Sequence, residues 1–183
     1  MKIYTKTGDT GQTGLLGGDR IAKNSARIDA IGTIDELNAY IGICCSVIDD
    51  STFLLRLERI QNQLFDLGAE LACLPNSKFN LTSITLGDIA ELENEIDEMV
   101  LELPPLKEFI LPGGCPSSSH VHYLRTICRR TEREILELHA INPIRSEPII
   151  YVNRLSDWLF CFSRLLNHRS QVAERKWTKR ENK

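Results

Sequence analysis

Apolar side chains recur every three or four positions along most of the chain, the spacing that places them on one side of an α-helix. Glycine, proline and cap residues separate five stretches of this kind. The expected helices begin near Ser25, span about 51–73 and about 86–103, include a central run at 124–135, and begin again near Ile149. No strand pattern is found beyond the first few residues. The sequence therefore predicts an all-α, five-helix up-and-down bundle with short links.

The central run carries two stripes of different character. Its apolar stripe, expected in the core, comprises Leu124, Ile127, Cys128, Thr131, Ile135 and Leu138. The second stripe, here called the arginine row, comprises Arg125, Arg129, Glu132 and Arg133. A guanidinium is always charged and presents a rigid fork of donors suited to phosphate, so the row is typical of a site for a polyanion. A solvated face on which Glu132 pairs with its neighbouring arginines would show the same spacing.

Composition narrows the classes of ligand. The chain has 183 residues, 42% of them hydrophobic and 26% charged, which indicates a single domain, 1–183, with a sizeable core. The domain divides into an amino-terminal arm (1–24), the helical bundle (25–168) and a basic tail (169–183), which is expected to fray. The net charge of -3 argues against nucleic-acid binding and favours a small anionic ligand. With neither a membrane span nor a secretory signal in view, a cytoplasmic location is expected.

Cysteine and histidine positions bear on metal binding. Cys44 and Cys45 are adjacent, and Cys128 and Cys161 lie in apolar helical patterns, which suits buried thiols better than disulfides. His120 and His122 would point to different sides of a helix, and no Glu-x-x-His motif occurs. A metal centre held by protein side chains is therefore not expected.

The amino-terminal arm is rich in glycine and threonine. Glycines at 8, 11, 14, 17 and 18 alternate with Thr5, Thr7, Thr10 and Thr13. Exposed amides and hydroxyls of such a loop can surround phosphate oxygens, and Lys6 and Lys23 add positive charge. The spacing fits neither a Walker A loop nor a dinucleotide fingerprint. A flexible amino-terminal arm is the alternative.

Further polar and aromatic positions lie beside the apolar stripes. Asp35 adjoins the core face of the first helix and is either exposed or paired, the central arginines being the obvious cations. Phe109 precedes a Pro-Gly-Gly turn and belongs either to the core or to a pocket at the start of the central helix, which Ser117 to Ser119 are expected to cap. On the last helix, one stripe at the margin of the bundle carries Asn153, Asp157 and Arg164.

This inventory favours one kind of chemistry. No motif supports a catalytic triad. Instead, the arm, the two lysines and the arginine row are suited to holding a triphosphate and stabilising charge as it leaves. The nucleophile would then come from the second substrate.

Five motifs together resemble the PduO-type ATP:cob(I)alamin adenosyltransferases. They are YTKTGDTG at 4–11, GTIDEL at 32–37, FILPGG at 109–114, CRRTER at 128–133 and NRLSD at 153–157. The resemblance covers nearly the whole chain, in order. It implies a trimer of five-helix bundles, with sites between neighbouring subunits. It also implies transfer of the 5′-deoxyadenosyl group of ATP to the cobalt of reduced cobalamin, with release of triphosphate.

The resemblance also implies roles for individual residues. From the arm, ATP would be bound by Thr5, Lys6, Thr7, Gly8, Thr13, Gly14 and Lys23. From the adjoining subunit, it would be bound by Arg129, Arg130, Glu132, Arg133 and Asn153. Arg125 would pair with Asp35 between subunits, and Phe109 would face the corrinoid. Mg²⁺ would be held mainly by phosphate. Further partners would be a reductase and an adenosylcobalamin-dependent enzyme.

One segment departs from the family pattern. Cys115-Pro116-Ser117-Ser118-Ser119 follows the Gly113-Gly114 pair, where family members usually carry a less constrained segment, and this affects the expected detail of the corrinoid-facing loop. Two alternatives to the enzyme are a non-catalytic, ATP-binding regulatory bundle and a purely structural helical oligomer. The second leaves the arm and the arginine row unexplained.

Overall fold

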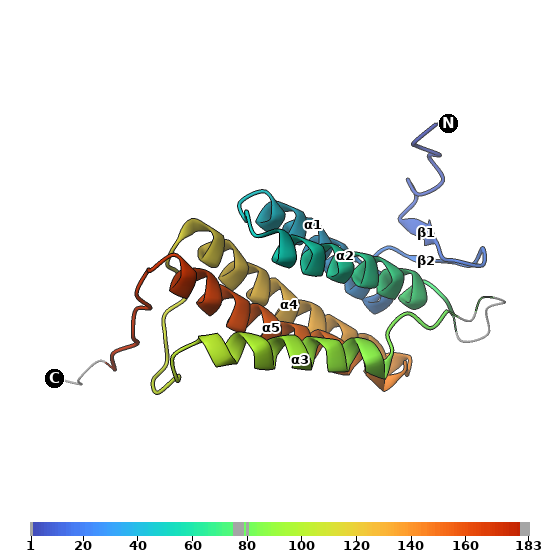
Figure 1. The fold of residues 1–183 in the computed structure, drawn as a ribbon. Helices are drawn as coiled ribbons and strands as arrows, with labels where there is room; N and C mark the ends of the chain where they lie inside the picture. The colour runs from blue at the N-terminus through green and yellow to red at the C-terminus, as the bar shows by residue number, and fades with distance from the viewer. Residues whose placement is uncertain (1, 75–78, 80, 180–183) are drawn as a thin grey trace.

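The computed structural model describes residues 2–74, 79 and 81–179 and contains the five predicted helices (Figure 1). The helices are α1 (Ala26–Cys45), α2 (Ser51–Leu71), α3 (Leu86–Glu102), α4 (Pro116–Ile141) and α5 (Ser146–Arg169). In the arm, the short strands β1 (Gln12–Gly14) and β2 (Arg20–Ala22) pair antiparallel. The all-α prediction is confirmed, with this hairpin as a small addition.

Consecutive helices run in opposite directions, as the up-and-down prediction requires (Figure 1). Contacts join α2 to α1, α1 to α4, α4 to α5 and α5 to α3, so α4 lies in the middle of the order. The arm lies at the end of the bundle where α1 begins, whereas the α3–α4 link lies at the opposite end (Figure 1). None of the helices within the described residues combines the length and apolarity needed to cross a membrane.

The apolar stripes form the core. On α4, all six residues of the predicted apolar stripe are buried, and the same is true of Ile34, Leu37, Ile41 and Cys44 on α1. Phe53 of α2 stacks on Phe162 of α5, with ring centroids 4.3 Å apart. Burying a large apolar side chain contributes about 1.5–3 kcal/mol, so this shared interior is the main stabilising feature.

Two helix starts differ from the sequence prediction. The residue that caps α4 is Cys115, not one of Ser117 to Ser119, and Pro116 takes the first helical position. Proline suits that position because its fixed φ is helical and no amide hydrogen is needed there. Helix α5 begins at Ser146 rather than near Ile149, because Pro148 falls within the first turn, where a missing N–H is tolerated.

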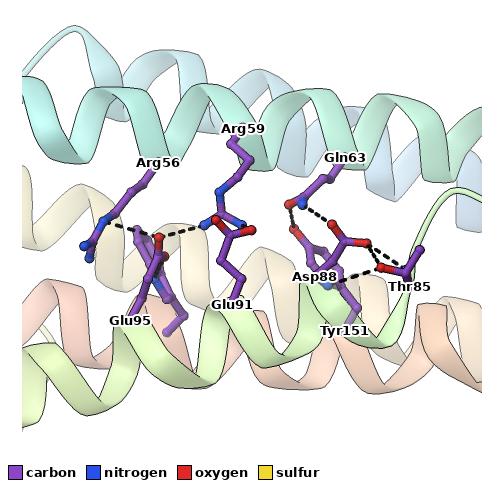
Figure 2. A network of polar contacts seen from close by, with 9 residues as sticks. Arg56, Arg59, Gln63, Thr85, Asp88, Glu91, Glu95 and Tyr151 are labelled. Carbon is purple, nitrogen blue, oxygen red and sulfur yellow. Dashed lines mark hydrogen bonds and ion pairs between the residues drawn. The ribbon is translucent and has the colours of Figure 1, made fainter.

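A polar network between α2 and α3 was not predicted from the sequence. Glu95 is only 7% exposed and accepts hydrogen bonds from Arg59 (2.9 Å) and the Trp158 indole (2.7 Å). Its carboxylate also lies 3.3 Å from Arg56 (Figure 2). A buried carboxylate is tolerated when its charge is paired and its oxygens are hydrogen-bonded, and here both conditions hold.

The same interface continues through a chain of neutral groups and one carboxylate (Figure 2). The Tyr151 hydroxyl donates to Gln63, whose amide donates to Asp88, both at 2.7 Å. Asp88 also completes the capping box of α3 with Thr85. The Thr85 backbone N–H donates to the Asp88 carboxylate, and the Asp88 backbone N–H donates to the Thr85 hydroxyl. Burial raises the pKa of Tyr151, which keeps its hydroxyl protonated as the donor.

The basic tail is ordered over residues 170–177, so the expectation that it frays is wrong there; residues 180–183 lie outside the described residues. The Leu111 amide donates to the Arg175 carbonyl at 2.7 Å, and the Trp177 amide donates to the Phe109 carbonyl at 2.8 Å. Arg164 is likewise not at the bundle's margin with Asn153 and Asp157. It is buried and ion-paired with Glu174 of the tail.

Candidate functional site

The arm has a defined conformation. Arg20 of β2 holds it together by donating to the carbonyls of Thr7 (2.6 Å) and Gln12 (3.1 Å). Gly8 lies against the Lys23 ammonium, since a Cβ added there would be 3.1 Å from Nζ. Lys6 has a φ of 60°, so its backbone makes a tight left-handed turn. The arm is thus a hairpin with exposed hydroxyls and amides. Arg20 has a structural role that the amino-acid composition of the arm did not indicate.

The hairpin, α1 and α2 enclose a groove of about 680 Å³. Four predicted site residues line it, namely Thr13, Gly14, Lys23 and Asp35. Most of the remaining lining is apolar and includes Phe65, which is 74% exposed. The groove therefore joins part of the arm to the exposed face of α1.

The three arginines of the arginine row, all on α4, differ in burial and in hydrogen bonding. Arg125 is half-buried, its guanidinium lies 6.0 Å from the Phe160 ring centroid, and its buried Nε has no hydrogen-bond partner. Burial and the adjacent positive charge of Arg129 lower the pKa of Arg125. Arg133 donates to the Arg129 carbonyl at 3.1 Å. Within residues 2–74, 79 and 81–179, none of these three arginines forms an ion pair.

Arg129 and Arg133 are exposed, as a solvated face requires, but among the described residues the pairing of Glu132 with these arginines is absent. Glu132 accepts a hydrogen bond from Asn153 of α5 at 2.8 Å instead of pairing with Arg129 or Arg133. Two predicted site residues on different helices are thereby brought together. Arg130 faces away from the row and forms an ion pair with Glu36 of α1. The row thus keeps its charge available.

Phe109 lies in the link between α3 and α4 and is 80% exposed, which excludes the core alternative left open by the sequence. Its ring meets that of Trp177 edge to face, with centroids 6.4 Å apart and planes at 86°. The Trp177 position, which the sequence left undefined, is therefore beside Phe109.

Asn167 of α5 fixes the Pro-Gly-Gly turn that follows Phe109. Its amide donates to the Gly113 carbonyl and accepts from the Cys115 amide, both at 2.9 Å. Gly114 has a φ of 125°, and a Cβ there would lie 1.9 Å from Asn167 Oδ1. Only glycine fits this approach. Asn167 was missed because no local sequence motif marks it.

The candidate residues form three groups in one chain. Thr13, Gly14, Lys23 and Asp35 share the groove, the arginine row and Asn153 lie across α4 and α5, and Phe109 lies at the far end of the bundle. In the described part of the chain, no hydrogen bond or ion pair joins the arm to the arginine row or Asp35 to Arg125.

Fold and site together define a five-helix bundle with a glycine- and threonine-rich hairpin and with three guanidiniums that have no ion-pair partner among the described residues. Both features suit an anionic ligand. The sequence profile described as cobalamin adenosyltransferase matches residues 3–166, and the chain belongs to this family.

Characterised relatives agree with the family match. A corrinoid adenosyltransferase of Bacillus subtilis is 42% identical over 179 residues, covering 95% of this chain and 91% of that protein. A cobalamin adenosyltransferase of Cupriavidus metallidurans is 42% identical over 177 residues, covering 96% and 94%. A variant of the PduO-type ATP:corrinoid adenosyltransferase from Lactobacillus reuteri, solved with cobalamin and ATP, has a TM-score of 0.94 and 36% identity, covering 97% and 100%.

Proposed function

We propose that this chain transfers the 5′-deoxyadenosyl group of ATP to the cobalt of cob(I)alamin, giving adenosylcobalamin and triphosphate. The observation that carries the proposal is the likeness, at 36% identity and over 97% of the chain, to an ATP:corrinoid adenosyltransferase solved with both substrates. The relatives favour this activity over the non-catalytic, ATP-binding regulatory bundle.

The reaction needs little general acid or base catalysis from the protein. The cobalt lone pair of cob(I)alamin forms the bond to the ribose 5′ carbon, the bond from that carbon to the triphosphate oxygen breaks, and the triphosphate leaves with the electron pair. The protein must therefore align the substrates and stabilise the departing negative charge. Arg129 and Arg133 are suited to the second task because no carboxylate in the described chain neutralises them.

ATP would be held from two sides. Thr5, Lys6, Thr7, Gly8, Thr13, Gly14 and Lys23 of the hairpin would supply amides, hydroxyls and ammonium groups. Arg129, Arg130, Glu132, Arg133 and Asn153 would complete the site. Glu132 and Asn153 already contact each other, so each fixes the other's orientation. Arg130 would first have to leave Glu36, and its contribution is expected to be the smallest.

Mg²⁺ is expected to enter with ATP, bound mainly by phosphate oxygens. Among the described residues, no group of three or more His, Cys, Asp or Glu side chains gathers into a metal site.

A homotrimer would unite the separated groups. The arm and the arginine row do not contact each other within one chain, and Asp35 and Arg125 each lack an ion-pair partner in the described residues. A neighbouring α4 placed over the groove would cover the exposed Phe65 and bring Arg125 to Asp35. A charge pair between subunits would then form the junction of the ATP and corrinoid sites.

Phe109 would face the corrinoid from the lower axial side. An apolar ring there excludes an axial ligand from cob(II)alamin, and a cobalt without that ligand is easier to reduce because the orbital that accepts the electron is lower. The exposure of Phe109 supports this role over one in the core. The cytoplasmic location, the reductase and the adenosylcobalamin-dependent enzyme stay predictions from the sequence.

The test is incubation of the protein with ATP, Mg²⁺ and chemically reduced cobalamin, following the cobalt–carbon bond by absorbance and triphosphate by chromatography. We expect adenosylcobalamin and triphosphate in equal amounts. ATP binding without a cobalt–carbon bond would support the regulatory bundle instead. Failure to bind either substrate would leave only the structural oligomer.

A further inference from the structure

After α5, the chain turns back along the link between α3 and α4, and residues 170–177 form what is here called the tail strap. Gln171, with a φ of 55°, makes the reversal, and the Val172 amide donates to the Asn167 carbonyl at 2.9 Å. The strap then pairs antiparallel with the link through an isolated bridge between Ile110 and Lys176. The red tail is visible beside the yellow-green link at one end of the bundle (Figure 1).

A buried ion pair fixes the strap to the bundle. Arg164 of α5 is 6% exposed and binds both carboxylate oxygens of Glu174, at 2.9 and 3.3 Å. The same guanidinium donates to the Pro104 carbonyl at 3.0 Å, so one side chain holds the strap and the start of the link together. Undocking the strap would leave the buried Arg164 charge uncompensated, so the ion pair strongly favours the docked strap.

The docked strap places Trp177 against Phe109. The amide of Trp177 donates to the Phe109 carbonyl, and the two rings meet edge to face. Phe109 is 80% exposed and Trp177 is 51% exposed, so both rings present apolar surface outward. Among the described residues, the indole is the only aromatic partner of the Phe109 ring. It therefore limits the orientations that an otherwise free, exposed ring can adopt.

We propose that Trp177 is a positioning residue for the corrinoid, holding the Phe109 ring in the orientation that occupies the lower axial space of cobalt. This inference rests on the proposed function, because it needs Phe109 to face the corrinoid. Edge-to-face contacts contribute about 0.5–1.5 kcal/mol beyond burial. Loss of that restraint should weaken cob(II)alamin binding about three- to tenfold and leave ATP binding unchanged, since the arm lies at the other end of the bundle.

The test compares three variants of the full chain. Trp177→Ala removes the indole, Trp177→Phe keeps an aromatic edge, and Lys176→Ala is the matched control. The control removes only the exposed pair with Glu108 (3.1 Å) and leaves the backbone bridge in place. The readouts are the cob(II)alamin dissociation constant, the four-coordinate fraction by electron paramagnetic resonance with ATP bound, and the KM for ATP. Thermal unfolding checks that each variant is folded.

We expect Trp177→Ala to lose both cob(II)alamin affinity and the four-coordinate signal, Trp177→Phe to retain most of each, and Lys176→Ala to match the wild type. If Phe109→Ala loses the signal but Trp177→Ala keeps it, the role of Trp177 is refuted and the proposed function stands. Equal losses in ATP and cobalamin binding would also refute it, because a general disturbance would then be the cause. A wild type without adenosylation or a four-coordinate signal would overturn the proposed function itself.

Discussion

Replacing Phe109 by alanine separates a role at the cobalt from a role in folding. A phenylalanine buries about 150–250 Å² when fully enclosed, and only a fifth of this side chain is hidden, which corresponds to about 40 Å². At about 25 cal/mol per Å², the loss on truncation is about 1 kcal/mol. Losing the edge-to-face contact with Trp177 adds about 0.5–1.5 kcal/mol. We therefore expect Phe109→Ala to lower the free energy of unfolding by about 1.5–2.5 kcal/mol.

The matched comparison is Phe162→Ala, because Phe162 is fully buried and stacks on Phe53. Emptying such a site costs about 3–5 kcal/mol, a difference that urea unfolding resolves easily.

The functional readout is the four-coordinate cob(II)alamin signal with ATP bound. Phe109→Ala should bind ATP normally and lose that signal, with activity falling most when cob(II)alamin must be reduced on the enzyme. A destabilisation above about 3 kcal/mol together with an intact signal would refute the reasoning, since Phe109 would then behave as a core residue.

Three further predictions test the site and the fold. Arg129→Lys keeps the charge and loses the donor fork, so kcat/KM for ATP should fall by the equivalent of about 1–3 kcal/mol; wild-type kinetics would contradict the role. A double-mutant cycle on Asp35 and Arg125, read by trimer dissociation and kcat/KM, should give a coupling energy of at least about 0.5 kcal/mol; a coupling of zero would reject the intersubunit pair. Burial and repulsion from Arg125 lower the pKa of His122 to about 4, whereas the unfolded chain has an ordinary pKa near 6.5. The unfolded state therefore takes up the proton first, and stability should fall as pH drops from about 6.5 towards 4; His122→Gln should flatten that slope in urea titrations, and an unchanged slope would contradict the assignment.

Helical periodicity predicted which side of each helix is buried, because a stripe repeating every 3.6 residues has one way to face a core. The five stripes and the charged row on α4 followed from this rule, whereas the direction changes followed from the short links. Periodicity does not report which distant side chains meet. Glu95 reads as one acid among many on α3, and its burial depends on Arg56, Arg59 and Trp158, which lie on two other helices.

The candidate site was predictable to different degrees. Glycine and threonine content identified the arm, since few other uses explain so many flexible and hydroxylated positions together. The tail was misjudged because its composition is that of a solvated segment. Its contacts depend on Arg164, ten positions before Glu174, and on Phe109, more than sixty positions before Trp177. Asn167 escaped notice because its amide serves a turn about fifty residues earlier in the chain.

The tail strap has a consequence for biosynthesis. Residues 170–177 emerge from the ribosome after all five helices, and a chain folds progressively as it is made. The bundle and the arm can therefore assemble while the link carrying Phe109 still lacks its antiparallel partner. The end that carries Phe109 is completed last, so a nascent chain or a product clipped after α5 would resemble the finished protein at the arm and differ from it at the link that we propose faces the corrinoid.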